Sequence, residues 1–234
     1  MNNLGIFQAL IFEPRRGFGE LDARPRFWWP LLLLVLLQGG IALWYVLFVD
    51  IEWLVDQQVR ASSLGANMTD AEIATMGRNA AGQVGVRAAL GAVIAGIALP
   101  LMLLISALYL LLATKVTGVE RSFRHWFALS AWSTLPVMLV GTLLAALALL
   151  TASNNQVSQA ALQPLSLNEL VFHREAGEPG YSLFSSVNLF QLFTVYLTAM
   201  GLKVWTVRSW TYCIIVAALP FVLVYGIWAF FALR

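Results

Sequence analysis

Residues 88–113 read AALGAVIAGIALPLMLLISALYLLLA, a run without a single charged side chain. A helix needs roughly 20 predominantly apolar residues to cross the hydrocarbon core of a bilayer. This run exceeds that length, and the charged residues Arg87 and Lys115 stand close to its two ends. The run therefore predicts a transmembrane helix.

Four more stretches on either side of this run have the same apolar character. Together the five predicted spans are residues 28–49, 88–113, 127–150, 187–205 and 209–233. Only helices and closed barrels satisfy every backbone polar group in lipid, and these stretches have the length of helices. The sequence thus predicts an all-α, polytopic transmembrane helical bundle of five spans, residues 28–234, that follows an N-terminal segment, residues 1–27.

The overall composition agrees with lipid as the solvent. Hydrophobic residues make up 60% of the chain and charged residues 11%, whereas a soluble domain has about 25% charged residues. The net charge of +2 is small and the basic residues are dispersed, which argues against a nucleic-acid partner. Cys213 is the only cysteine, so no internal disulfide can form.

The distribution of Lys and Arg predicts the orientation, because cytoplasmic connections carry the excess of these residues. With the N-terminus in the cytoplasm, the inner side holds Arg15, Arg16, Arg24, Arg26, Lys115, Arg121, Arg124, Lys203 and Arg208. The outer side then holds Arg60, Arg78, Arg87, Arg174 and Arg234. The excess inside predicts a cytoplasmic N-terminus, an outer C-terminus, and long outer loops over residues 50–87 and 151–186.

The polar connections also carry local signals. Thr69 followed by Glu72 is typical of a capping box and predicts a helix from Asp70. One interpretation of residues 50–60 is a continuation of the first span, and residues 164–188 are interpreted as a loop.

Leu4, Ile6, Phe7, Leu10, Ile11 and Phe12 make the first dozen residues apolar but too short to span. They are expected to form an interfacial helix, with a disordered tail as the alternative.

Tryptophans stand near the ends of the predicted spans, among them Trp28, Trp126 and Trp205. Such rings favour the boundary between headgroups and hydrocarbon, so we expect them there. Prolines lie inside three of the spans, Pro100, Pro136 and Pro220, and are expected to kink these helices.

Uncharged polar residues within the spans admit two interpretations. Hydrogen bonds between helices are the simpler one. The other is a polar cleft for a lipid headgroup or small solute, with the candidate residues Ser106, Ser133, Thr134, Gln191 and Thr194.

Small residues four positions apart allow close helix packing, and the pairs are Gly91 with Ala95, Ala92 with Gly96, Gly141 with Ala145 and Cys213 with Ala217. The partner helix could belong to the same bundle, to a second copy of the chain or to another protein, and the pattern does not distinguish them.

Several short motifs resemble one known family. Pro14, Phe18 and the pair Arg24-Pro25 precede the first span, and residues 118–124 read GVERSFR before the third. This pattern, with Pro136 later in the third span, resembles the bacterial branch of the Ypt-interacting protein (Yip) family. The resemblance implies a five-span bundle in the bacterial inner membrane with a cytoplasmic N-terminus.

Eukaryotic members of that family are associated with small GTPases and vesicle traffic through a cytoplasmic Asp-Leu-Tyr-Gly-Pro motif and a Gly-Tyr element. This sequence lacks the motif, and its one Gly-Tyr pair, Gly180-Tyr181, lies in a loop assigned to the outer side. The resemblance therefore does not extend to GTPase binding.

Recognisable catalytic chemistry is missing from the sequence. It contains no Gly-rich phosphate loop, nucleophile elbow or His-Glu-x-x-His pattern. The two histidines, His125 and His173, are assigned to opposite sides of the membrane, which argues against a shared metal site. We expect neither an enzyme nor a cofactor.

The function that fits these features is a membrane scaffold or adaptor that binds lipids or a protein partner. Its cytoplasmic face is expected to include Arg15, Arg16, Arg24, Gly118, Arg121, Phe123 and Arg124. The alternative is a transporter or channel component that carries a small or lipidic substrate through the polar cleft.

Overall fold

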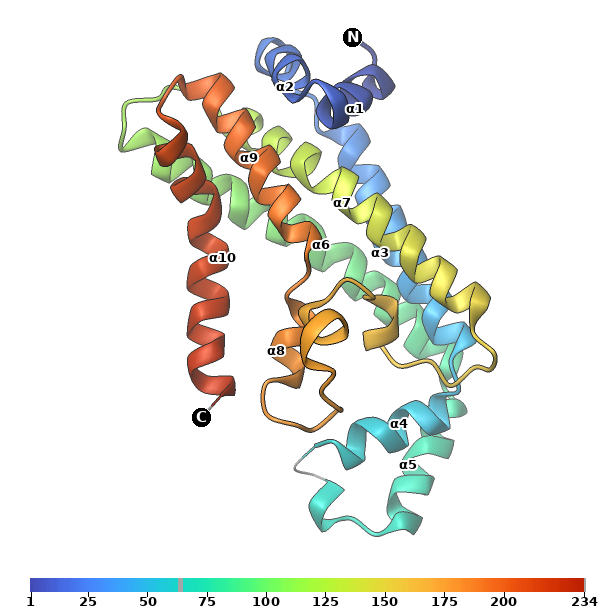
Figure 1. The fold of residues 1–234 in the computed structure, drawn as a ribbon. Helices are drawn as coiled ribbons and strands as arrows, with labels where there is room; N and C mark the ends of the chain where they lie inside the picture. The colour runs from blue at the N-terminus through green and yellow to red at the C-terminus, as the bar shows by residue number, and fades with distance from the viewer. Residues whose placement is uncertain (63–64, 234) are drawn as a thin grey trace. The chain divides into compact units, whose positions relative to one another are not determined.

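The computed structural model describes residues 1–62 and 65–233, and Figure 1 shows its helices. Over these residues the α-helices are α1 Asn3–Phe12, α2 Pro14–Ala23, α3 Trp28–Phe48, α4 Ile51–Arg60, α5 Asp70–Ala81, α6 Val84–Lys115, α7 Phe123–Thr151, α8 Tyr181–Ser186, α9 Phe190–Thr206 and α10 Trp210–Ala232. No strand occurs in the described part of the chain, where the pair Ser166–Asn188 forms an isolated bridge. The all-α prediction is confirmed for these residues.

Four helices are long and apolar enough to cross a membrane: α3, α6, α7 and α10. These correspond to the first, second, third and fifth predicted spans. The remaining predicted span, residues 187–205, corresponds to α9, which has 17 residues and a length of roughly 26 Å. Residues 63–64, in the first of the two loops predicted to be outer, and Arg234 lie outside the described residues.

The chain divides into two compact units. Unit 1 comprises Met1–Leu37, Gly96–Val140 and Phe190–Val224. Unit 2 comprises Gln38–Ala95, Gly141–Leu189 and Tyr225–Arg234. The helices α1, α2 and α9 belong wholly to unit 1, and α4, α5 and α8 wholly to unit 2, while the four long apolar helices contribute to both.

The core of unit 1 contains the largest buried side chains of the described chain, Trp126 and Trp132 on α7. Phe18 and Leu21 of α2 and Leu197 of α9 pack into the same cluster. The N-terminal helices are therefore part of a shared core. A helix that only lay on a membrane surface would turn its apolar side chains toward lipid, whereas Ile6 and Leu10 of α1 are buried in this core.

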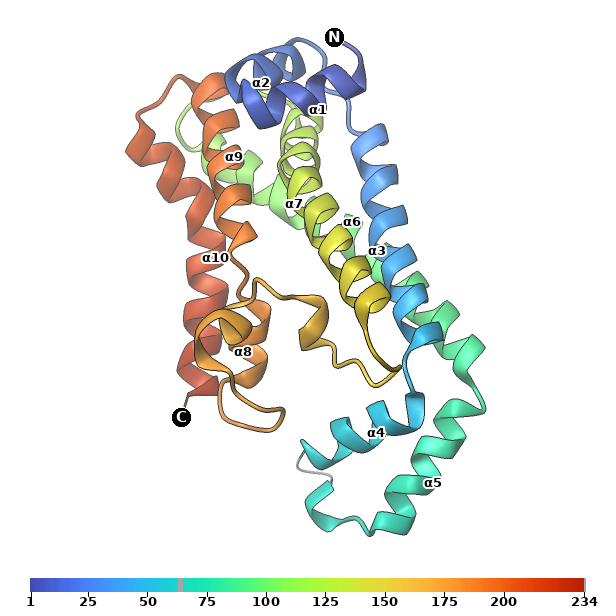
Figure 2. The same cartoon turned by 45° about the vertical axis from the view of Figure 1, so that its right-hand side comes forward.

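Two of the tryptophans near span ends are buried inside the protein. Trp126 and Trp205 are 0% and 3% exposed, respectively. Helix α2 packs against α9, as the two views in Figures 1 and 2 show, and the side chain of Phe18 contacts Trp205. These two rings are buried within unit 1 and do not face lipid, whereas Trp28 is 71% exposed, and the depth of the two rings in the membrane stays a prediction.

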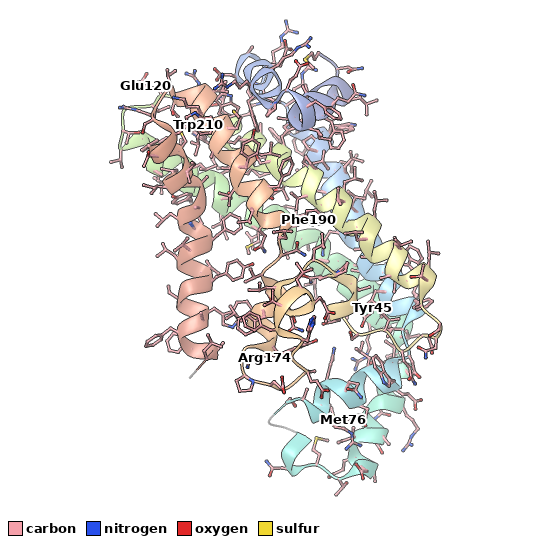
Figure 3. The ribbon with its side chains drawn as sticks, viewed as in Figure 1. Tyr45, Met76, Glu120, Arg174, Phe190 and Trp210 are labelled. Atoms are coloured by element: carbon pink, nitrogen blue, oxygen red, sulfur yellow. The ribbon has the colours of Figure 1, made fainter. Side chains whose placement is uncertain are left out.

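In unit 2, a new helix begins directly after α3. Asp50 has an extended backbone, and its carboxylate accepts a hydrogen bond from the backbone N–H of Trp53 at 3.1 Å, which caps α4. The continuation of the first span through residues 50–60 is therefore wrong. Tyr45, labelled in Figure 3, lies in the core next to this break, and its hydroxyl donates to the Val157 carbonyl oxygen at 2.9 Å.

The predicted helix from Asp70 is confirmed as α5. The Thr69 hydroxyl accepts a hydrogen bond from the Glu72 N–H, and the Glu72 carboxylate accepts one from the Thr69 N–H. Helix α5 packs closely on α4, because a Cβ on Gly77 would lie 3.3 Å from the Glu52 Cα.

The segment interpreted as a loop, residues 164–188, contains helical turns. A single π-helical turn covers Asn168–Phe172. Gly180 has a left-handed backbone conformation, and α8 begins directly after it. Arg174, labelled in Figure 3, lies over the Phe184 ring at 5.3 Å. The segment is therefore an ordered part of unit 2.

Candidate functional site

The N-terminal cap consists of α1, α2 and residues 24–27, all within unit 1. Asn2 starts α1 by accepting a hydrogen bond from the Gly5 N–H at 2.8 Å. Pro14 takes the first position of α2, where its missing N–H costs no helical hydrogen bond. The two helices pack tightly, since a Cβ on Gly17 would lie 3.0 Å from the Leu10 side chain.

The cap is held on α9 by an aromatic contact and a hydrogen bond. The rings of Phe18 and Trp205 meet edge to face with centroids 6.4 Å apart, and the Trp205 indole N–H donates to the Phe18 carbonyl oxygen at 2.8 Å. Gly201 permits this approach, because a Cβ there would lie 3.2 Å from the Phe18 ring. Buried aromatic pairs of this geometry add about 0.5–1.5 kcal/mol beyond their area.

An ion pair holds the end of α2. The Arg121 guanidinium, just before α7, donates from Nε and Nη2 to both oxygens of Asp22, at 2.8 and 3.0 Å. Such a two-point contact fixes direction as well as distance. His125 completes the contact by placing its Nε2 3.3 Å from the Asp22 carbonyl oxygen and its Nδ1 2.8 Å from the Ser122 hydroxyl.

The connection from α2 to α3 is held by α7. The Arg124 Nε donates to the Pro25 carbonyl oxygen at 3.0 Å, and the Trp132 indole N–H donates to the Arg26 carbonyl oxygen at 2.6 Å. Phe27 then stacks edge to face on Phe127, with centroids 5.0 Å apart. Side chains of α7 and the turn before it thus hold the cap from Asp22 to Phe27.

The connection between α6 and α7 is shaped by glycine. Gly118 has a φ of +75°, a left-handed conformation that few other residues adopt without strain, and the Val119 N–H returns to the Thr114 carbonyl oxygen at 3.2 Å. Figure 3 labels Glu120 in this connection. The turn directs the chain so that Arg121 can reach the cap.

The predicted cytoplasmic face divides into two groups of arginines. The Arg121 guanidinium is paired with Asp22, and Arg124 donates from Nε to the Pro25 carbonyl oxygen. Arg15, Arg16 and Arg24 are exposed on the cap. Of these, Arg16 pairs with Glu13 at 3.3 Å, while the side chains of Arg15 and Arg24 make no hydrogen bond or ion pair with the described part of the chain.

The predicted polar cleft residues all belong to unit 1, where two helices share one polar contact. The Ser130 hydroxyl of α7 donates to the Ser106 hydroxyl of α6 at 3.2 Å. The Thr134 hydroxyl donates to the Ser130 carbonyl oxygen of its own helix. The Ser133 hydroxyl is buried without a hydrogen-bond partner among the described residues. On α9, Gln191 and Thr194 are half-buried.

The three prolines lie inside α6, α7 and α10, as their sequence positions require. Some small residues of the four-residue patterns serve packing within the chain. A Cβ on Gly96 would lie 3.6 Å from the Val35 side chain, whereas Gly91 and Gly141 face open space.

The sequence interpretation missed Asp22, Trp132 and the docking role of Phe18. In the sequence, Phe18 and Arg121 belong to two separate short motifs. Asp22 close to Phe18 and Arg121 in the second motif carry opposite charges, and this complementarity was the one signal in the sequence that could have predicted their contact.

A family model described as "Yip1 domain" matches residues 8–231, which is most of the chain. A search of curated proteins and a search of solved structures found no match to the chain. The matched range includes the second half of α1, all of α2 and the GVERSFR turn. The chain therefore belongs to the Yip1 domain family.

Proposed function

We propose that this protein is a membrane scaffold or adaptor that crosses the bacterial inner membrane five times, with its N-terminus in the cytoplasm and its C-terminus outside. Family membership and four apolar helices support a membrane protein. Helix α9 is the remaining span, because 17 residues meet the lower limit of about 17 for a transmembrane helix. The excess of Lys and Arg on the inner side supports the orientation.

The observation that carries the scaffold role is the folded state of the cap. A tail of 27 residues without tertiary contacts would pay a large ordering entropy on binding any partner. Here Phe18 and Asp22 are held by Trp205 and Arg121, so the solvent-exposed face of α2 is already ordered. A preorganised face with exposed charges favours specific association.

The exposed arginines indicate the chemistry of the partner. The side chains of Arg15 and Arg24 form no hydrogen bond or ion pair with a described residue, although the N-terminal ammonium and, more weakly, Arg24 lower the pKa of Glu20. An acidic surface on another protein could therefore pair with both arginines. Arg121 and Arg124 hold the N-terminal cap and are not part of the proposed partner surface. GTPase binding and catalysis form no part of the proposal.

A charge reversal tests this role. The variant Arg15→Glu with Arg24→Glu should lose the proteins that co-purify with the wild-type chain in mild detergent after cross-linking, because like charges now face the acidic partner. The matched control is Arg78→Glu with Arg87→Glu, which makes the same charge change in unit 2 and should retain them. Quantitative mass spectrometry provides the comparison. Identical recovery from the wild type and both variants would refute the proposal.

Transport through the bundle remains the second candidate, favoured by the Ser133 hydroxyl. This group lies on α7, is buried, and has no hydrogen-bond partner among the described residues. Burying a hydroxyl without a partner costs free energy. A transported solute or headgroup would satisfy it. An experimental density map in a lipid environment tests this, because a transporter predicts non-protein density within hydrogen-bond distance of the Ser133 Oγ, and an adaptor predicts none.

A further inference from the structure

An aromatic groove lies on unit 1 beside the N-terminal cap. It has a volume of about 560 Å³ and is lined by Phe27, Trp28, Leu31, Pro100, Leu104, Phe123, Arg124 and Phe127. These residues come from the starts of α3 and α7, the residue before α3, and the middle of α6. The volume falls within the range of about 300–1,000 Å³ that is typical of small-molecule sites.

The aromatic rings form a continuous wall. Phe27 lies 4.8 Å from Trp28 and 5.0 Å from Phe127, and Phe123 lies 6.0 Å from Phe127, all measured between ring centroids. Trp28 is 71% exposed and Leu104 is 42% exposed, although both belong to helices apolar enough to span a membrane. The groove therefore presents an apolar floor that remains open in the isolated chain.

One cation is part of this wall. Arg124 supplies the only charged side chain among the lining residues, and its guanidinium carbon lies 5.9 Å from the Phe27 ring centroid. The Nε atom is fixed on the Pro25 carbonyl oxygen at 3.0 Å, while the two Nη atoms make no hydrogen bond to a described residue. The side chain is thus oriented, exposed and able to donate further hydrogen bonds.

We propose that this groove binds one anionic phospholipid, with an acyl chain along the aromatic wall and the headgroup phosphate on the Nη atoms of Arg124. The depth fits, because Trp28 and Arg124 lie in the first turns of α3 and α7, where apolar helices emerge into the headgroup region. The charge fits as well, since a guanidinium at a helix N-terminus recognises phosphate.

A second copy of the chain fits the groove less well. Helices α3, α6, α7, α9 and α10 contain no Asp or Glu, so none of these spans could bring a carboxylate to Arg124 within the membrane. A phospholipid supplies both the apolar chain and the anion in one molecule.

The lipid site does not depend on the scaffold role, and the proposed orientation only determines the leaflet from which the lipid comes. Loss of the protein partner in the charge-reversal experiment and loss of the lipid are therefore separate outcomes.

Native mass spectrometry of the full chain tests the site with two probes that share their acyl chains, dioleoyl phosphatidylglycerol and dioleoyl phosphatidylcholine. The wild type should retain one phosphatidylglycerol with a preference of about tenfold over phosphatidylcholine. Both lipids carry the phosphate, but the choline ammonium of phosphatidylcholine repels the Arg124 guanidinium and cancels the headgroup's net charge. Arg124→Gln should abolish the preference. The control Arg15→Gln removes the same charge from an exposed position outside the groove and should keep it.

A second matched pair tests the apolar wall. Leu104→Trp fills the groove and should lower retention of both lipids, while Ile105→Trp places the same side chain on the neighbouring exposed position, which does not line the groove, and should leave retention unchanged. Equal retention of the two lipids by the wild type would overturn the proposal. So would an unchanged preference in Arg124→Gln, or equal behaviour of the two tryptophan variants.

Discussion

Two helical pairs lie outside the long apolar helices, and they are held by different means. The pair α4–α5 is stabilised mainly by residues close in sequence: the Thr69–Glu72 capping box and exposed ion pairs from Arg60 to Asp56 and Asp70. The pair α1–α2 is held by distant residues, since Asp22 and Arg121 are separated by 99 positions and Phe18 and Trp205 by 187.

The difference teaches which pair depends on the rest of its unit. The α4–α5 pair can form from local signals and then pack its base, Ile51 and Ala80, into the core of unit 2. The cap acquires its position only when α7 and α9 are assembled. Substitutions in the cap contacts should therefore be felt throughout unit 1, whereas those in α4–α5 should remain local.

The largest effect is expected from Phe18→Ala. The ring is 0% exposed, and removing a buried Phe side chain costs about 3–5 kcal/mol. We expect the Tm in detergent to fall by about 10 °C and trypsin to cut faster at the cap arginines. Phe12→Ala, in the same cap but 79% exposed, should behave like the wild type. A wild-type Tm and cleavage rate for Phe18→Ala would show that the cap is not held by this contact.

A smaller effect is expected from Asp22→Asn, which leaves the Arg121 guanidinium without its carboxylate. The two side chains are 27% and 35% exposed, so we expect a loss of about 1–2 kcal/mol rather than the larger cost of a fully buried pair. Thermal unfolding measures the loss. Combining Asp22→Arg with Arg121→Asp should recover part of the stability.

The control for the ion pair comes from α4. Asp56→Asn breaks the exposed contact with Arg60 and should change the Tm little, as surface pairs contribute about 0–1 kcal/mol. An equal loss from Asp56→Asn and Asp22→Asn would remove the distinction between the two helical pairs.

The smallest effect is expected from Thr69→Ala, which removes the hydroxyl that satisfies a backbone N–H at the start of α5, at a cost of about 1 kcal/mol. Hydrogen exchange should quicken in the α5 amides and stay unchanged in α1 and α2. The Thr69 N–H and hydroxyl donate to Glu72 and hold the pKa of that carboxyl below its ordinary value of 4.5.

A lowered carboxyl pKa has a definite consequence for pH. The stabilisation of α5 by Glu72 is present above the ordinary pKa and is lost as the pH falls through the lowered value in the folded state. Exchange in α5 should therefore quicken in acid, and Glu72→Gln should remove this pH dependence. Acid-induced quickening that persists in Glu72→Gln would assign it to another group.

The contrast between the two pairs also explains what could be predicted from the sequence. The start of α5 was predictable because Thr69 and Glu72 are three residues apart, and this spacing is typical of a capping box at a helix N-terminus. The long apolar helices were predictable because lipid leaves few alternatives. The contacts of Phe18 and Asp22 were not, because the sequence does not reveal which of several arginines and tryptophans a distant residue will meet.

Tryptophans illustrate the same limit. A Trp near the end of an apolar stretch commonly marks the headgroup boundary, and Trp28 is exposed in agreement with this rule. Trp126 and Trp205 are buried in the core of unit 1, where Trp126 contacts Trp205 and Trp205 contacts Phe18 of the N-terminal cap. The Trp205 indole N–H finds a partner in the Phe18 carbonyl oxygen, whereas the Trp126 indole nitrogen has no hydrogen-bond partner among the described residues.

Whether α9 crosses the membrane is tested most directly by labelling single cysteines in intact cells, in a Cys213→Ser background. Ala176→Cys precedes α9 and Val207→Cys follows it, and both positions are exposed. Five spans with the N-terminus inside predict that an impermeant maleimide labels Ala176→Cys and reaches Val207→Cys only after the cells are permeabilised. Labelling of both positions from outside would contradict the account.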